Sequence, residues 1–193
     1  MATPYKYDRG QKIKAEGGPV DMAFLAHVEL SADQTVAADS DGIITIAMTA
    51  SKKTVTSGFE DMPAARNITV VGSAAGISGT CKVTGTNIAG ETIEESFTLS
   101  GTTPQTGSKA FASVTKVEIP AKNADDDAVD VGWGVKFGIP YKLALNTVLA
   151  AYINGAKEAT APTVAVSTSA LESNTISFNT TPSGKATHYF LIV

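Results

Sequence analysis

Alternation of apolar and polar residues with a period of two is the feature that most constrains how this chain folds. It is clearest in residues 129–139, VDVGWGVKFGI, and in residues 80–99, TCKVTGTNIAGETIEESFTL. Successive side chains of a β-strand point to opposite faces, so each run predicts a strand with one apolar face. Threonine and valine, which are frequent in these runs, also favour strands. The pattern therefore predicts a chain built from half-buried β-strands.

Residues 80–99 are expected to form a β-hairpin. Cys81 and Val83 share one face before a turn at NIAG, and Gly90 suits a left-handed backbone position that closes that turn. Glu95 breaks the pattern on the inner face, which implies either a bulge that shifts the register or a place near a solvated edge. The apolar face resumes after the turn with Ile93, Phe97 and Leu99.

Residues 129–139 predict a second strand, in which one face carries no polar side chain. Gly132, Gly134 and Gly138 lie on the opposite face, which suggests that a second layer or a second chain packs closely on that side. The residues expected to share the apolar face are Val129, Val131, Trp133, Val135, Phe137 and Ile139.

Further strands are expected at both ends of the chain. In AFLAHVEL, residues 23–30, the apolar side chains fall on one face, while His27 and Glu29 fall on the other. Residues 143–153 fit either a helix or a strand, and the following Asn154-Gly155 pair, a strong hairpin signal, favours the strand. The apolar stretch 190–193 is expected to pair within a sheet, either of its own subunit or of a neighbour.

Together these segments predict an all-β fold, an antiparallel sandwich or barrel with hairpins. We expect residues 1–21 to form an extended N-terminal arm, because they are polar and Gly17, Gly18 and Pro19 lie near their end. Residues 22–160 are expected to form the main β domain. Residues 161–193 are expected to form C-terminal strands, either within that domain or as a small separate unit, after a joint at Pro162.

Composition and charge argue against several classes of partner. The 193 residues carry a net charge of −4 and contain two arginines, Arg9 and Arg66, which disfavours nucleic-acid binding. An acidic chain without a run of ~20 apolar residues is not expected to bind or cross a membrane. The N-terminus has no apolar core, so we expect no signal peptide and synthesis in a cytoplasm.

Residue types that often carry chemistry are present but do not form recognisable motifs. His27 and His188 lie in different expected strands, far apart in the sequence, and we expect structural or surface roles for both. The single cysteine, Cys81, excludes an intramolecular disulfide and is expected to be a small buried side chain. The glycine-rich stretch 72–80 lacks both the Walker A lysine and a following helix, so we expect a loop.

Two groups of carboxylates are open to a binding or catalytic interpretation. Asp125–Asp127, with Asp130 nearby, could attract Ca²⁺, but the EF-hand spacing is missing and a solvated acidic loop is expected. Glu91, Glu94 and Glu95 could act as paired carboxylates, yet Glu91 and Glu94 are expected on opposite strand faces. The sequence therefore assigns no catalytic, cofactor-binding or metal-binding residue, and we expect a protein that is not an enzyme and needs no cofactor.

Most of the chain from residue 66 onward resembles a family of tailed-bacteriophage virion proteins that includes head decoration, or cement, proteins. The resemblance rests on residues 66–121, RNITVVGSAAGISGTCKVTGTNIAGETIEESFTLSGTTPQTGSKAFASVTKVEIPA, and on the later phrases VDVGWGVKFGIPYKL, NTVLAAYINGAKEATAPTVAVSTSALESNTISFN and YFLIV. These segments resemble the family in their overall residue composition and contain no catalytic motif, so no functional residue is carried over from the family.

The resemblance implies a protein on the exterior of the virion capsid that binds the assembled head and stabilises contacts between major capsid protein subunits. It also implies self-association, as a trimer or another ring, and synthesis in the cytoplasm of a host bacterium. Tyr5, Tyr7 and Arg9 in the arm are candidate anchors, and the C-terminal strand is a second candidate through strand addition. The alternatives are another virion component, such as a tail tube, baseplate or fibre, and a carbohydrate-binding β-sandwich.

Overall fold

A computed structural model describes residues 13–15, 18–20 and 23–193. It confirms the all-β prediction: the described chain consists of antiparallel strands and two single-turn 3-10 helices. Among these residues no helix is long and apolar enough to cross a membrane. The elements are β1 (Ile13–Ala15), β2 (Gly18–Val20), β3 (Leu25–Leu30), η1 (Asp33–Thr35), β4 (Asp39–Ala47), β5 (Lys53–Val55), β6 (Arg66–Gly72), β7 (Ser78–Thr86), β8 (Thr92–Ser100), β9 (Gln105–Phe111), β10 (Ser113–Ile119), β11 (Ala128–Gly138), β12 (Val148–Ile153), β13 (Ala156–Lys157), β14 (Thr163–Ala165), η2 (Leu171–Ser173), β15 (Thr175–Ser177) and β16 (Thr187–Ile192).

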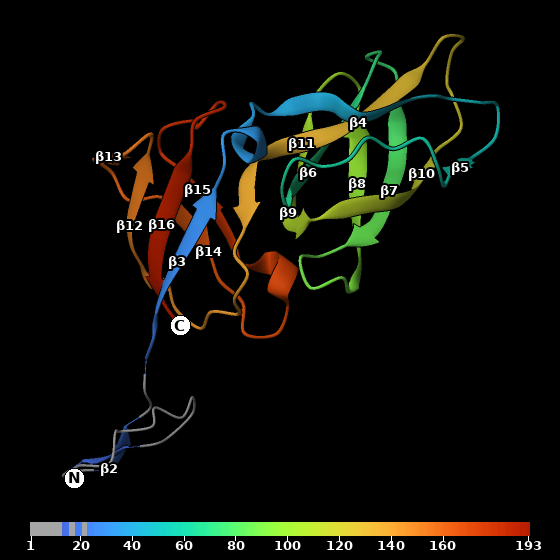
Figure 1. The fold of residues 1–193 in the computed structure, drawn as a ribbon. Coiled ribbons are helices and arrows are strands. Elements are labelled where there is room, and N and C mark those ends of the chain that lie inside the picture. The colour runs from blue at the N-terminus through green and yellow to red at the C-terminus, as the bar shows by residue number, and fades with distance from the viewer. Residues whose placement is uncertain (1–12, 16–17, 21–22) are drawn as a thin grey trace.

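The first of two hydrophobic cores lies between two sheets (Figure 1). One sheet has the strand order β5-β10-β7-β8, and the other has the order β14-β15-β11-β6-β9, with β4 also paired to β11. The alternating side chains predicted from the sequence meet here, because each strand turns its apolar face inward. Fully buried members of this core include Ile68, Val83, Phe111 and Val117.

The hairpin predicted for residues 80–99 is confirmed as β7 and β8. Their pairing runs without a register shift from Thr86 opposite Thr92 to Ser78 opposite Ser100. Gly90 has a φ of 79°, as the turn requires. Of the two explanations for Glu95, the edge is correct, because β8 ends its sheet and no bulge interrupts the pairing.

Strand β11 passes from the first core into the second. Val129 and Val131 belong to the first core, whereas Phe137 and Ile139 belong to the second. The expected close approach on the glycine face is confirmed within this one chain: a Cβ on Gly132 would lie 1.9 Å from the backbone oxygen of Asp39. The strand is therefore shared between two parts of the molecule.

Val135, which the sequence places on the apolar face of β11, is not buried, since its side chain is 48% exposed. The register of β11 against β6 shifts between Trp133 and Phe137. Asn67 is fully buried at this shift, and its Oδ1 accepts a hydrogen bond from the Lys136 N–H at 2.8 Å. The side-chain amide thus replaces a missing backbone acceptor, and Val135 lies where the pairing of β11 with β6 is interrupted.

The second core is covered by the sheet β13-β12-β16-β3, seen on the left of Figure 1. Its buried residues come from distant parts of the sequence, including Ala26, Leu143, Ile176 and Leu191. The expected boundary between residues 160 and 161 falls between β13 and β14. Residues on both sides of that boundary share this core.

Two expectations for the C-terminal half are confirmed. Residues 148–153 form a strand, β12, and the following Asn154 and Gly155 have φ values of 51° and 78°, as in a tight hairpin turn. The apolar end of the chain forms β16, which pairs with β12 on one side and with β3 on the other. The suggestion that this C-terminal strand could accept an added strand is therefore wrong, because both of its edges are already paired.

Candidate functional site

Strand β3 leaves one edge of its sheet open. Phe24 and Val193 exchange two backbone hydrogen bonds, of 2.8 and 2.9 Å, just beyond the β3–β16 pairing. In antiparallel pairing, alternate residues bond to the partner, so the backbone N–H and C=O groups of Leu25, His27 and Glu29 point away from β16. No described strand pairs with that side of β3. Such an edge is a template for pairing with another chain.

Four rings lie beside this open edge, on the outer surface of the same sheet. His27 stacks on Phe190 with 4.4 Å between ring centroids, and Tyr152 stacks on His188 at 4.9 Å. His27 and His188 meet edge to face at 5.3 Å. We call Tyr152, His27, His188 and Phe190 the aromatic face.

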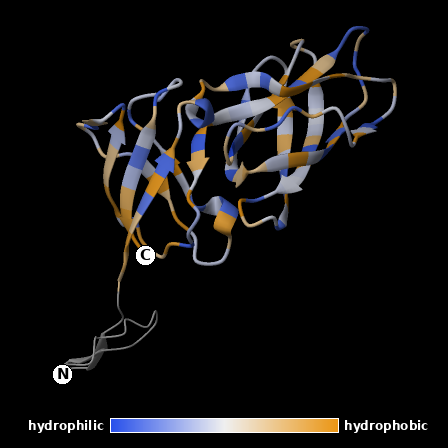
Figure 2. Ribbon diagram, in the orientation of Figure 1, coloured by the Kyte–Doolittle hydropathy of each residue, from blue (hydrophilic) through white to orange (hydrophobic). Residues whose placement is uncertain are grey.

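The register of the sheet explains why the four rings meet. His27 lies opposite Phe190 in the β3–β16 pairing, and Tyr152 lies opposite His188 in the β12–β16 pairing. Cross-strand pairs on one face bring side chains into direct contact. Apolar and polar residues follow one another along these strands, as the hydropathy colours of Figure 2 show. Leu25, 61% exposed, extends the apolar surface at one end of β3.

Charged and polar groups border the aromatic face. His27 Nε2 lies 3.5 Å from Glu29 Oε1 on the open strand itself. A hollow of about 420 Å³ lies beyond them, where β3 ends, and Glu29, Ser31 and His188 are among its lining residues. Apolar rings with a polar rim are typical of protein–protein contact surfaces.

Sequence reasoning placed His27 and His188 on strands but missed their contact. Alternation puts His27 on the polar face of its strand, yet it does not say which strand becomes the neighbour. The contact depends on pairing between β3 and β16, which lie at opposite ends of the sequence. The one available signal was that both histidines lie in short strands with aromatic or apolar neighbours.

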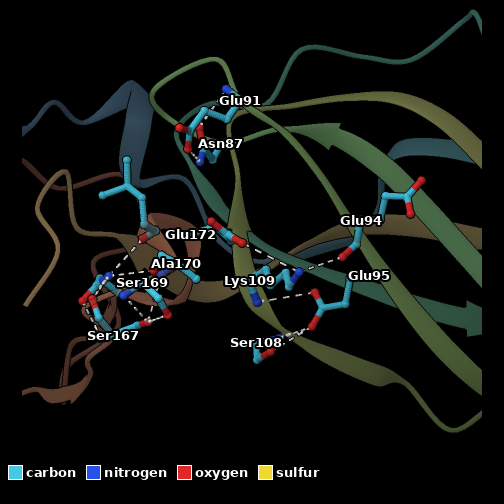
Figure 3. Close-up of polar contacts among 12 residues, drawn as sticks. Asn87, Glu91, Glu94, Glu95, Ser108, Lys109, Ser167, Ser169, Ala170 and Glu172 are labelled. Atoms are coloured by element: carbon cyan, nitrogen blue, oxygen red, sulfur yellow. Dashed lines mark hydrogen bonds and ion pairs between the residues drawn. The ribbon is translucent and has the colours of Figure 1, made fainter.

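The three glutamates of the β7–β8 hairpin bind different partners rather than one another (Figure 3). Glu91 accepts a hydrogen bond from Asn87 at 2.8 Å, and Glu94 pairs with Lys82 at 2.7 Å. The hydrogen bond between Lys82 and Glu94 lowers the pKa of the glutamate and raises that of the lysine. Each carboxylate thus has a structural partner.

Glu95 joins the two sheets of the first core across their open side. Its carboxylate accepts hydrogen bonds from the backbone N–H and the hydroxyl of Ser108 in β9, at 2.7 and 2.9 Å. The neighbouring Lys109 donates to the Glu94 carbonyl oxygen at 3.0 Å and lies 3.7 Å from Glu172 of η2 (Figure 3). This network connects β8 and β9 to η2, which directly precedes β15, a strand that contributes Ile176 to the second core.

The acidic loop uses its carboxylates locally. Asp127 is buried and accepts hydrogen bonds from the backbone N–H groups of Asn123 and Ala124, while Asp125 pairs with Lys122. Asp130 accepts a hydrogen bond from the Thr45 hydroxyl at 2.7 Å. Within the described ranges, no three His, Cys, Asp or Glu side chains gather closely enough to hold a metal ion.

The remaining residues named from the sequence are either buried or outside the described chain. Cys81 is fully buried, as predicted, and desolvation raises the pKa of its thiol to about 12. Tyr5, Tyr7 and Arg9, the candidate anchors of the arm, lie outside the described residues.

Comparison with protein-family models, with curated proteins and with solved structures found no match to this chain.

Proposed function

We propose that this chain is a structural protein of a tailed-bacteriophage virion, which binds the outside of the assembled head and braces neighbouring major capsid protein subunits. The sequence phrases from residue 66 onward support the viral assignment. The open edge of β3 beside the aromatic face is the observation that carries the binding role.

The edge and the aromatic face can act as one docking surface. The outward N–H and C=O groups of β3 can add a strand from a capsid subunit, and main-chain hydrogen bonds of this kind supply affinity. The adjacent rings supply selectivity, because aromatic side chains bury much apolar surface with few rotatable bonds. An assembled shell presents many identical sites, so contacts that are weak singly become strong when several are made together.

Self-association as a trimer or another ring fits the same role. Copies around a local symmetry axis would contact one another through closed heterologous interfaces, and each copy would still present its own β3 edge to the shell. Such an assembly would be a partner of the major capsid protein on the capsid exterior, formed after synthesis in the host bacterial cytoplasm.

A proline at position 27 tests the docking surface. The His27 N–H points away from β16, so His27→Pro should keep the sheet intact while removing one donor from the open edge. His27→Ala is the matched control, because it loses the same imidazole ring but keeps the N–H. We expect co-sedimentation with heads that lack the protein to be lost for His27→Pro and largely retained for His27→Ala. Equal binding of the two variants would refute strand addition at this edge.

Removal of residues 1–18 tests the arm separately. If Tyr5, Tyr7 and Arg9 anchor the protein, the shortened chain should bind heads more weakly than the full chain does. Unchanged binding would assign no anchoring role to the arm and would leave the β3 edge as the proposed contact. Antibody labelling of intact virions distinguishes the head from a tail tube, baseplate or fibre location.

Carbohydrate binding is the second candidate, and the aromatic face is the observation that favours it. Stacked rings on an open sheet surface are suited to the apolar faces of sugars as well as to protein side chains. A glycan array with the full chain and a Tyr152→Ala variant addresses this candidate. Specific glycan binding that Tyr152→Ala abolishes would favour carbohydrate recognition over capsid docking, and an array without hits would exclude it.

A further inference from the structure

Arg66 is a buried cation to which the described part of the chain supplies no acidic partner. Its side chain is 1% exposed, and Nη1 donates to the Val36 carbonyl oxygen at 2.8 Å. Its guanidinium carbon lies 4.6 Å from the centre of the Phe137 ring, and Nε has no hydrogen-bond partner. No described residue forms an ion pair with Arg66. Burying a charge in this way is costly unless an opposite charge compensates it.

Arg66 is one of the residues that line a cavity of about 80 Å³. Val36 and Phe137, the two residues that contact the guanidinium, are also part of the cavity wall. A cavity needs only about 10–15 Å³ by the same measure to hold one water molecule, so a small organic group fits here. Besides Arg66, the lining residues are Val36, Val135, Phe137, Phe178, Thr181 and Pro182.

This wall has the chemistry of a carboxylate site. Five of its seven lining residues have apolar side chains, and its one charge is the cation of Arg66. Burial lowers the pKa of Arg66 to about 10, which still leaves the side chain charged at neutral pH. Attraction between opposite charges is much stronger in such surroundings than in water. Nε is buried without a hydrogen-bond partner, and the N–H groups of a guanidinium match the oxygens of a carboxylate.

We propose that this pocket binds a carboxylate group carried on a short apolar stem, with Arg66 as the anion-binding residue. The apolar walls would contact the stem, and the guanidinium would bind the carboxylate oxygens. The carboxylate can belong to a free small acid or to the end of a polypeptide. The proposal goes beyond capsid docking and does not depend on it, because the pocket and the β3 edge use different residues.

Calorimetric titration with propionate tests the proposal on the full chain. Propionamide, which has the same shape without the charge, is the matched ligand control and is added at equal ionic strength. We expect saturable binding of propionate and binding of propionamide that is at least about tenfold weaker. Equal binding of the two ligands would overturn the proposal, as would an absence of binding by both propionate and the peptide described below.

Two variants locate the binding. Arg66→Met removes the cation and keeps a long side chain, so we expect the affinity for propionate to fall at least about tenfold. Lys185→Met removes one exposed positive charge outside the cavity lining and should leave binding unchanged. Full binding by Arg66→Met would overturn the assignment. If Arg66→Met does not fold, the comparison of propionate with propionamide on the unaltered chain still decides the question.

A short peptide ending in Ala-Val, with a free or an amidated C-terminus, distinguishes the two sources of the carboxylate. Binding of the free-acid peptide alone identifies a polypeptide terminus as a ligand. Binding of propionate without either peptide identifies a free acid. Equal binding of the free and amidated peptides, with no response to propionate, would overturn the proposal.

Discussion

The contact between Asn67 and Gly134 allows a sharp test of how β11 is held at its irregular point. Asn67 is fully buried and accepts a hydrogen bond from the Lys136 N–H, where the register of β11 against β6 shifts. A Cβ on Gly134 would lie 2.5 Å from Asn67 Nδ2, so the glycine leaves the space that the amide occupies. The two residues should therefore respond to substitution as a coupled pair.

The magnitudes follow from these contacts. Asn67→Ala should lower the free energy of unfolding by about 2–3 kcal/mol, because an unsatisfied donor costs about 1–3 kcal/mol and the emptied space adds to this. Gly134→Ala should lower it by about 1–3 kcal/mol through overpacking. In the double variant the new methyl group enters the space left by the amide. Its total loss should be close to that of Asn67→Ala alone, which implies a coupling of at least about 1 kcal/mol.

Urea denaturation, followed by Trp133 fluorescence and far-ultraviolet circular dichroism, measures all four proteins of this double-mutant cycle. Coincident transitions by the two probes are the control for two-state unfolding. If the decrease in unfolding free energy of the double variant equals the sum of the two single decreases to within about 0.5 kcal/mol, the two residues are independent. That result would refute this account of the irregularity in β11.

Three further predictions concern single residues. Burial raises the pKa of the Cys81 thiol from 9.0 to about 12, so the folded state favours the neutral thiol. The free energy of unfolding should therefore decrease as the pH rises from about 9 to 12. In urea denaturation at alkaline pH, Cys81→Ala should show a smaller decrease than the unaltered chain. The Tyr189 hydroxyl is buried without a hydrogen-bond partner, so Tyr189→Phe should leave the melting temperature unchanged or raise it, and a clear decrease would show that the hydroxyl is bonded. Gly155 has a φ of 78°, so Gly155→Ala should lower the free energy of unfolding, measured by urea denaturation, by about 1 kcal/mol. An unchanged free energy of unfolding would contradict a left-handed backbone at this turn.

Local patterns predicted the local parts of this fold. The β7–β8 hairpin needs only alternation on both sides of Gly90, and both signals lie within 20 residues of sequence. The turn at Asn154 and Gly155 is similarly local, since its two positive φ values match a residue pair that favours them. The side chains expected to be buried in these segments are largely those that the structure buries.

Partner choice and irregular geometry could not be predicted in the same way. Alternation shows which face of a strand is apolar, but it does not identify the strand that will lie beside it. The pairing of β3 with β16 therefore stayed unknown, and with it the aromatic face and the closed edges of the C-terminal strand. The exposure of Val135 was not predicted either, because Val135 lies where the pairing of β11 with β6 is interrupted, and a single asparagine in a strand-like segment gives no signal of such an interruption.

Because β11 runs through both cores, it affects how the molecule unfolds. Val131 and Phe137 lie on one continuous strand, yet they are buried in different cores. Unfolding of either core removes packing contacts from β11, and β11 also contributes buried side chains to the other core. Amide hydrogens in β6 and β16 should therefore exchange with solvent through a common opening event. The two cores should unfold as one cooperative unit rather than independently.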